Sequence, residues 1–293
     1  MPSGCASSPV PAAVSAASTR SPSPGPARVV VNDVGGRRDG TGEDAQLAQQ
    51  AADEIIAAGG QAIANTDDVS SWDGAARVVS QAIEVFGGLD VLVNNAGILR
   101  DRTLVSMTED EWDAVIRVHL KGTFAPSHHA AAYWRERVKR GHPVDARIVN
   151  TTSVAGLYAN PGQSNYGAAK AGIAAFTQIA AQELARYGVT VNAVAPSALT
   201  RLTADLGLAD DITAKLDPAV VANVVVWLAS GLSSDVTGQV LESSGITFAV
   251  AEGWRRGPMT REVPSSPEQV DEIARKLLAQ SAPRTTMADI ADG

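Results

Sequence analysis

Two patterns of apolar residues alternate along the chain. Short continuous apolar runs, such as Val29–Val31, are typical of strands buried on both faces of a parallel sheet. Longer stretches of helical composition end at glycine pairs such as Gly59-Gly60 and Gly87-Gly88. The two patterns predict strands over 28–33, 61–65, 89–93, 147–152, 189–194 and 239–242, and helices over 43–58, 71–86, 108–140, 163–187, 218–229 and 267–278.

Strands that alternate with helices predict an α/β fold, in which a Rossmann-like, doubly wound parallel sheet is covered by helices on both faces. Ligands of such sheets bind outside the carboxyl ends of the strands. Five residues with polar or turn-forming character follow strand ends in this sequence: Asp33, Asp68, Asn95, Ser153 and Pro196. This coincidence predicts a binding site along one edge of the sheet.

Composition divides the chain into three parts. Residues 1–26 are rich in Ser, Ala and Pro, and their six prolines disfavour regular structure, so a disordered leader is expected. The leader lacks the basic start and apolar core of a signal peptide. Residues 27–258 form the α/β domain. Residues 259–293 are Pro-rich and charged, and we expect a peripheral tail with one short helix.

Charge and cysteine content exclude several classes of protein. The 293 residues carry a formal net charge of −8, which argues against nucleic-acid and anionic-membrane partners. A single cysteine, Cys5, excludes a disulfide scaffold. Apolar runs fall short of the ~18 residues that a membrane span needs. With neither an export signal nor paired cysteines, the expected location is the cytoplasm.

Three residues form a candidate catalytic set. Tyr166 and Lys170 are four positions apart on a predicted helix and therefore share a face. A free phenol has a pKa of about 10, and a nearby ammonium group lowers it. Tyr166 could then exchange a proton with a hydroxyl or carbonyl oxygen, while Ser153, at the adjacent strand end, holds the same oxygen.

Together with Asn94-Asn95-Ala96-Gly97, this set resembles the short-chain dehydrogenase/reductase family over residues 27–253. The resemblance implies a homo-oligomeric oxidoreductase that uses NAD or NADP on a small-molecule substrate. Ser153 would orient the carbonyl group, Tyr166 would be the general acid/base, and Lys170 would lower the pKa of Tyr166 and bind the nicotinamide ribose. The implied cofactor-binding residues are Asp33, Asp68, Val69, Asn95, Ala96, Gly97, Tyr166, Lys170, Pro196, Ala198 and Leu199.

The residue at position 33 predicts which nicotinamide cofactor is used. A carboxylate at the end of this strand accepts a hydrogen bond from a ribose 2′-hydroxyl and repels a 2′-phosphate, so Asp33 favours NAD over NADP. Arg37 and Arg38 stand close by and could pair with a phosphate. The alternative is that both arginines lie on a solvated turn.

Three longer segments resemble one particular branch of this family. Val30–Gly36, Asn94–Arg102 and Arg117–Phe124 are similar to the (3R)-hydroxyacyl-CoA dehydrogenase domain of peroxisomal multifunctional enzymes of type 2 and their bacterial relatives. This likeness implies a 3-hydroxyacyl thioester that is interconverted with its 3-oxo form. Two alternatives within the family are a 3-oxoacyl-carrier-protein reductase and a dehydratase or epimerase that keeps its NAD bound.

Histidines need separate consideration. Many family members have Asn where His119 stands, and use it in a water-linked proton relay. His119 could relay protons as well, because histidine titrates near neutrality, or it could be a packed helical residue. His128 and His129 are adjacent on a helix and should face different ways, so we expect no metal site there.

One family feature is missing from the sequence. The family has a first strand and a Thr-Gly-x-x-x-Gly-x-Gly turn ahead of Asp33, and that strand lies in the middle of the sheet. Pro9 and Pro11 should prevent the leader from replacing it. One hypothesis is that residues 1–26 are an out-of-frame translation of the glycine-rich turn, since codons chosen for Cys5–Ser15 encode Val-Arg-Val-Val-Thr-Gly-Ala-Gly-Arg-Gly-Ile one base away. The alternative is a non-catalytic, truncated paralogue that binds no cofactor.

Overall fold

The computed structural model describes residues 15–19, 28–42, 44–197, 217–287 and 289 of the chain, and the backbone alone for 15–19. Its centre is one eight-stranded sheet with the order β3-β2-β1-β4-β5-β6-β7-β8. Strands β2 and β3, and β4 to β7, pair in parallel, while β1 and β8 run antiparallel to their neighbours. The strands are β1 (Ser15–Thr19), β2 (Arg28–Asn32), β3 (Gln61–Asn65), β4 (Val91–Asn94), β5 (Ala146–Thr151), β6 (Val189–Ser197), β7 (Val240–Ser244) and β8 (Phe248–Val250).

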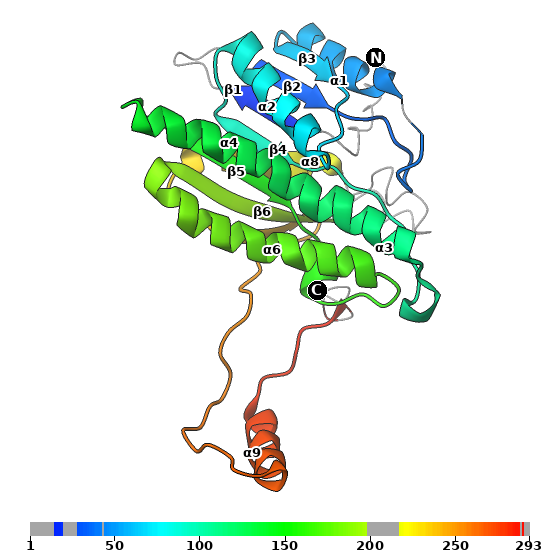
Figure 1. Ribbon diagram of the computed structural model, residues 1–293, viewed down its shortest axis with the longest axis vertical. Coiled ribbons are helices and arrows are strands. Elements are labelled where there is room, and N and C mark those ends of the chain that lie inside the picture. The colour runs from blue at the N-terminus through cyan, green and yellow to red at the C-terminus, as the bar shows by residue number, and fades with distance from the viewer. Residues whose placement is uncertain (1–14, 20–27, 43, 198–216, 288, 290–293) are drawn as a thin grey trace, which may run out of the picture.

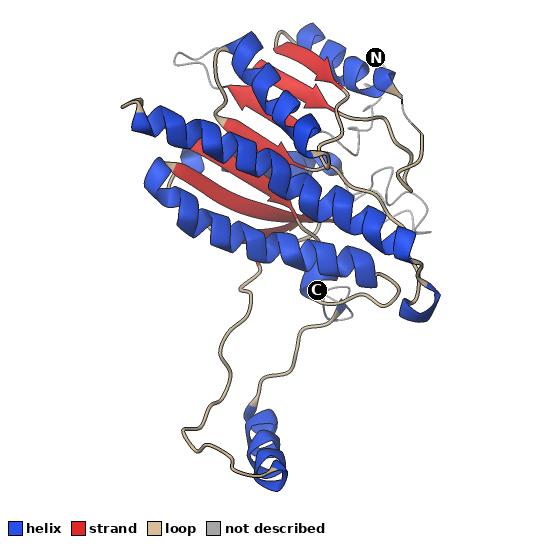
Figure 2. Cartoon of the chain, in the orientation of Figure 1, coloured by secondary structure: helices blue, strands red, loops and turns tan. Residues whose placement is uncertain are grey.

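Helices cover both faces of this sheet (Figures 1 and 2). Helices α2, α4 and α6 pack on one face, and α1 and α8 on the other. The helices are α1 (Ala45–Ala57), α2 (Trp72–Phe86), α3 (Glu109–Ile116), α4 (Gly122–Lys139), α5 (Val154–Leu157), α6 (Ser164–Leu184), α8 (Pro218–Ala229) and α9 (Pro267–Gln280), with 3-10 turns η1 (Leu104–Ser106), η3 (Ala185–Tyr187) and η4 (Gly231–Ser233) and a π-helical segment η2 (Arg117–Lys121). The expected α/β, Rossmann-like fold is confirmed.

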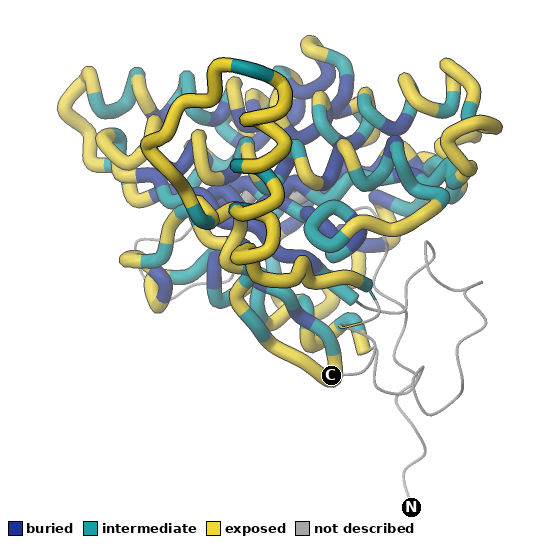
Figure 3. The backbone as a smooth tube through the Cα atoms, turned by 90° about the horizontal axis from the view of Figure 1, so that it is seen from below, coloured by how far each residue is buried: buried dark blue, intermediate teal, exposed yellow. Residues whose placement is uncertain are grey.

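Alternation along the buried strands divides the core into two layers. Val30 packs into the cluster beneath α2, α4 and α6, whereas the next residue, Val31, packs against α1 on the opposite face. Both valines are fully buried, as a strand covered on both sides requires. Buried residues follow the strands and the inner turns of the helices in Figure 3. The continuous apolar runs of the sequence therefore have a direct structural cause.

The centre of the sheet differs from the expectation. We expected residues 1–26 to be a disordered leader that could not replace the first strand, but β1 lies between β2 and β4. Its five residues lie between Pro11 and Pro22 and include no proline, so each can pair with a neighbour. Ser15 pairs with Asn32 and Thr19 with Arg28, so β1 begins at the carboxyl edge of the parallel strands instead of ending there. The last residue of β1, Thr19, therefore lies at the edge of the sheet opposite the carboxyl ends of the parallel strands.

The C-terminal segment extends away from the sheet (Figure 1). Helix α9 confirms the short helix expected near residue 267, and its N-terminus is capped by Ser266, whose side chain accepts from the Gln269 N–H. Every residue of α9 is exposed or only partly buried, consistent with a peripheral tail. Among the described helices, none is long and apolar enough to span a membrane.

The glycine that connects α6 to β6 provides a test of this packing. Gly188 has φ of 74°, and a Cβ at this position would lie 2.2 Å from the Val144 carbonyl oxygen. Gly141 has φ of 78°, with open space around a Cβ. Gly141→Ala should cost only the left-handed strain, about 1–2 kcal/mol, and Gly188→Ala about 1–3 kcal/mol more because of the clash. Urea unfolding of both variants measures the difference, and equal losses would contradict this description of the turn.

Candidate active site

The carboxyl edge of the sheet brings the three candidate catalytic residues together. Ser153 follows β5 and caps the single turn of α5, where its Oγ accepts from the Ala155 N–H at 3.2 Å. Tyr166 and Lys170 stand one turn apart on α6. The Ser153 hydroxyl lies close enough to the Tyr166 phenol to act on its pKa, and Lys170 Nζ lies 5.5 Å from the centre of the Tyr166 ring. The spacing in the sequence predicted this proximity.

Two hydrogen bonds fasten α6 to the end of β5. Lys170 Nζ donates to the Thr151 carbonyl oxygen at 2.6 Å, and Thr152 Oγ1 donates to the Lys170 carbonyl oxygen at 2.7 Å. Lys170 is only 3% exposed. A buried ammonium group needs polar partners, so the bond to Thr151 helps to hold the lysine below the tyrosine ring.

The protonation behaviour of Tyr166 differs from the expectation that Lys170 lowers its pKa. Burial raises the pKa of Tyr166 above the ordinary phenol value; the nearby Ser153 hydroxyl acts in the opposite direction, and the charge of Asp101 adds to the rise. Burial also lowers the pKa of Lys170 to about 7, so the lysine is partly uncharged near neutral pH. The reason is that both groups lie away from water, where the charged form of each is disfavoured.

His119 lies on η2 and is 1% exposed. Its Nε2 is 2.8 Å from the carbonyl oxygen and 3.1 Å from the amide nitrogen of Ile98, and its ring meets the Tyr166 ring edge-on, with centroids 5.1 Å apart. Burial and the charge of Lys170 lower the pKa of His119 to about 3. Nδ1 has no hydrogen-bond partner among the described residues. His119 is therefore a packed, neutral imidazole beside the tyrosine.

A cavity of about 230 Å³ is lined in part by Val118 and Ile98, the chain neighbour and the hydrogen-bond partner of His119; Ser153, Tyr166 and Lys170 do not line it. Five residues expected to bind cofactor line it together: Asp33, Asp68, Val69, Ala96 and Gly97. Glycines of the loop after β2 and the side chain of Arg37 form another part of the wall. Of the five strand-end residues that the sequence singled out, Asp33 and Asp68 therefore share this pocket, whereas Asn95, Ser153 and Pro196 do not line it.

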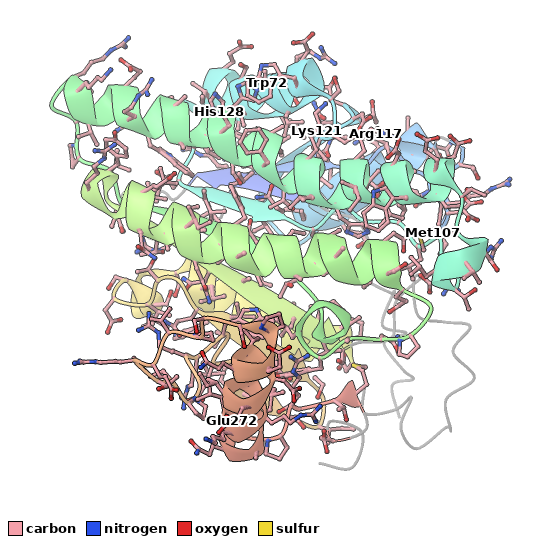
Figure 4. The ribbon with its side chains drawn as sticks, turned by 60° about the horizontal axis from the view of Figure 1, so that its bottom comes forward. Trp72, Met107, Arg117, Lys121, His128 and Glu272 are labelled. Carbon is pink, nitrogen blue, oxygen red and sulfur yellow. The ribbon has the colours of Figure 1, made fainter. Side chains whose placement is uncertain are left out.

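Asp33 and Asp68 are held differently in this cavity. Asp33 is 4% exposed, and its Oδ1 accepts from the Gly35 N–H at 2.8 Å. Asp68 accepts from the N–H and Oγ of Ser70, and from Arg117 Nη1 at 2.9 Å. Burial acts to raise the pKa of Asp68, but these hydrogen bonds and the Arg117 charge together hold it below its usual range. Arg117 is labelled on η2 in Figure 4.

Asn95 and Pro196, two further residues expected to bind the cofactor, lie at or near the same edge. Asn95 Oδ1 accepts from Thr151 Oγ1 at 2.9 Å, which links the ends of β4 and β5. Pro196 lies near the end of β6, in register with Ser243 of β7. Ala198 and Leu199 lie outside the described residues.

His128 and His129 were expected to face different ways, and this expectation is wrong. Both rings contact Trp72 of α2, with centroid separations of 4.7 and 4.5 Å, and Figure 4 shows Trp72 and His128 side by side on α2 and α4. Neighbouring helical side chains can converge when a large ring on the adjacent helix lies between them. The indole ring offers the pair an aromatic contact.

Sequence reasoning missed two polar residues next to Tyr166. Asn165 is fully buried, and its side chain contacts three separate pieces of backbone. Asp101 accepts from Gln163 Nε2 at 2.9 Å and raises the pKa of Tyr166. The signal that could have found Asn165 is a polar residue directly before the tyrosine, in a helix turn that must pack inward.

The fold and the site define an α/β enzyme with a serine, a tyrosine and a lysine at the carboxyl edge of a doubly wound sheet. The family profile described as short chain dehydrogenase matches residues 40–208, more than half of the chain. The chain therefore belongs to the short-chain dehydrogenase/reductase family and is an oxidoreductase.

Individual relatives agree with this assignment. The chain is 47% identical to the hydroxyacyl-CoA dehydrogenase ChsB1 of Mycobacterium tuberculosis, over 73% of this chain and 68% of the relative. It is 37% identical to mouse peroxisomal multifunctional enzyme type 2, over 78% of this chain but only 29% of that longer protein. The crystal structure of a short chain dehydrogenase from Mycobacterium avium superposes with a TM-score of 0.78 at 49% identity, over 88% of each chain.

Because the imidazole of His119 is buried, we expect the free energy of unfolding to depend on pH. The folded-state pKa of His119, about 3, lies below the unfolded value of about 6.5, so the unfolded state binds the proton more tightly. The stabilisation is complete above about pH 6.5 and is lost as the pH falls toward 3, amounting to a loss of about 2 kcal/mol at about pH 5. His119→Asn should remove that part of the acid destabilisation.

Urea unfolding at about pH 7.5 and 5 measures this effect. His142→Asn, at an exposed histidine, is the control for the same chemical change. If the pH dependence of His119→Asn equals that of the unmodified protein, His119 does not titrate as its burial requires.

Proposed function

We propose that the protein catalyses reversible hydride transfer between NAD and the C3 position of a 3-hydroxyacyl thioester, interconverting it with the 3-oxo form. The observation that carries the proposal is the grouping of Ser153, Tyr166 and Lys170: the Ser153 hydroxyl lies beside the Tyr166 phenol, and Lys170 is held behind the tyrosine ring. A substrate oxygen placed between the two hydroxyl groups would be within reach of both.

The described residues fit the adenosine end of a nicotinamide cofactor. Asp33 is buried, lines the cavity and is placed at the end of β2, where a carboxylate can accept from ribose hydroxyls. Val69 and Ala96 give the same cavity apolar walls that suit a flat base. Because a carboxylate repels a 2′-phosphate, we propose NAD as the cofactor, although Arg37 in the same wall would suit the phosphate of NADP.

Each catalytic side chain has a definite role in this proposal. When bound, the nicotinamide accepts or supplies the hydride. Tyr166, whose pKa is raised, is protonated at neutral pH and can donate its proton to the 3-oxo oxygen during reduction. During oxidation Tyr166 must first lose that proton, and Ser153 and Lys170 would stabilise the resulting phenolate through a hydrogen bond and through charge. His119, neutral and packed, would hold the tyrosine ring.

The substrate class rests on relatives and on the surface beside the site. The named relatives include a hydroxyacyl-CoA dehydrogenase and peroxisomal multifunctional enzymes. Leu104 and Val105 of η1 are 75% and 95% exposed and would suit an acyl chain. A carrier-protein thioester remains the alternative substrate, which a comparison of CoA and carrier-protein forms distinguishes. Homo-oligomeric assembly and a cytoplasmic location complete the proposal.

One observation favours a second candidate function, a non-catalytic paralogue. Strand β1 begins at the carboxyl edge, so it does not lead a glycine-rich turn toward the pocket as the family pattern requires. Titration of the purified chain with NAD separates the two candidates, since a chain that binds no NAD cannot be the proposed dehydrogenase. Net NADH production from a 3-hydroxyacyl-CoA separates a dehydrogenase from an epimerase or dehydratase that keeps its NAD bound.

Tyr166→Phe tests the proposed proton transfer. The change removes one hydroxyl group, so kcat should fall by about 10²–10⁴-fold while NAD binding persists. Tyr187→Phe is the matched control, because Tyr187 lies on η3 with its ring against Arg186 and should keep full activity. NADH absorbance gives kcat and a fluorescence titration gives NAD affinity. Unchanged turnover in Tyr166→Phe would eliminate the role assigned to this residue.

Asp33→Ser tests cofactor selection. Removing the carboxylate takes away an acceptor for the ribose and a charge that repels phosphate, so the ratio of NADP to NAD affinity should rise by about 10–100-fold, as for a charged hydrogen bond. The double variant Asp33→Ser/Arg37→Ala should lose that gain if Arg37 pairs with the 2′-phosphate. Equilibrium titrations with both cofactors measure the ratios, and an unaltered ratio in Asp33→Ser would show that selectivity lies elsewhere.

A further inference from the structure

The segment Leu99–Arg102 connects two parts of the site that are far apart in the sequence. On the cofactor side it contacts the loop after β2: the Leu99 N–H donates to the Arg38 carbonyl oxygen at 2.8 Å, and Arg100 Nε donates to the Asp39 carbonyl oxygen, also at 2.8 Å. That loop lines the cavity through Arg37 and Gly40. A displacement of this connecting segment would therefore move the cofactor loop.

On the other side, one side chain holds the connecting segment to α6. Asn165 Nδ2 donates to the Arg100 carbonyl oxygen at 3.0 Å and to the Glu111 carbonyl oxygen at 3.2 Å. Asn165 Oδ1 accepts from the Tyr166 N–H at 2.7 Å. The side chain is fully buried, at 0% exposure, so water cannot replace these bonds.

Gln163 strengthens the same connection. Its Nε2 donates to Asp101 Oδ2 at 2.9 Å, and its backbone pairs with Arg102 in an isolated parallel bridge. Gln163 occupies the N-cap of α6, but its side chain makes no capping hydrogen bond and donates to Asp101 instead. The first N–H groups of a helix have no backbone acceptor within the helix, and the Tyr166 N–H instead donates to the side chain of Asn165.

We propose that Asn165 is a positioning residue that locks the catalytic turn of α6 to the cofactor loop through Leu99–Arg102. The proposal rests on the proposed function, since it assigns a purpose to that same site. When the lock is intact, the phenol of Tyr166 and the cavity walls keep one relative position. Without it, tyrosine and cofactor are aligned less often, and misalignment of about 1 Å can cost about 10²-fold in rate.

Asn192 offers a matched control. It is 1% exposed, its Nδ2 donates to the Val236 carbonyl oxygen at 2.8 Å, and its Oδ1 accepts from the Gln239 N–H at 3.0 Å. It therefore makes the same kinds of bond from the amino half of β6. Asn165→Ser and Asn192→Ser should lower Tm by similar amounts, because each leaves similar backbone groups without a partner.

Only Asn165→Ser should affect catalysis. We expect kcat to fall by about 10–100-fold, NAD affinity to weaken, and the pH profile of kcat to shift because Asp101 moves relative to Tyr166. Asn165→Asp, which keeps the acceptor for Tyr166 but loses both donors, should show the same defect at alkaline pH. Full activity in Asn165→Asp, or equal kcat losses in Asn165→Ser and Asn192→Ser, would overturn the proposal.

Amide hydrogen exchange of the protein without cofactor tests the contacts of Asn165 independently of any enzymatic activity. Asn165→Ser should increase exchange in both 99–102 and 36–42, and Asn192→Ser in neither. This result would support the lock even if the unmodified protein proved inactive. Exchange in Asn165→Ser that rises only within α6 would show that the residue merely caps its own helix.

Discussion

Backbone hydrogen bonding at the centre of the sheet is the constraint on which the rest of the structure depends. β2 and β4 both present N–H and C=O groups toward the same buried position, and unpaired groups there would be costly. Strand β1 pairs with both neighbours through its backbone. Because backbone pairing needs no particular side chain, a segment as plain as Ser15–Thr19 can fill the position, and it can do so in either direction. The two halves of the carboxyl edge, with Asp33 on one side and Ser153 on the other, are thereby held in one sheet.

Local signals in the sequence predicted most of this architecture. Helix α8 has the bounds predicted for it, 218–229, and its local signals agree with the sequence: Asp217 caps the helix and Pro218 suits a first helical position. Ser153, Tyr166 and Lys170 could be placed together because strand ends converge and positions four apart share a helix face. The direction of β1, the edge strand β8 and the contacts of Asn165 could not be predicted, since each depends on which backbone groups distant segments leave unpaired.

Burial determines the electrostatic character of the site more than pairs of charges do. Tyr166, Lys170 and His119 all have pKa values shifted toward their neutral forms, each mainly because of burial. Sequence reasoning considered only the effect of the lysine charge on the tyrosine, and therefore predicted the opposite direction for Tyr166. In such surroundings a single charge, such as that of Asp101 or of an incoming substrate, acts over a longer distance than it would in water. The pKa values of these side chains should therefore respond strongly to the charge of a molecule that binds in the site.

The π-helical segment Arg117–Lys121 has a consequence for how this chain could vary. A π-turn accommodates one extra residue, and one residue corresponds to about 100° of rotation about a helix axis. This rotation allows His119 to face the tyrosine while Trp134, further along α4, stays buried with its Nε1 bonded to the Leu89 carbonyl oxygen. Loss of a single residue here would produce an unbroken α-helix in which those two side chains could not both keep their positions. The π-helical segment therefore sets the rotation of His119 relative to Trp134 about the helix axis. The number of residues in this segment is as constrained as their identity.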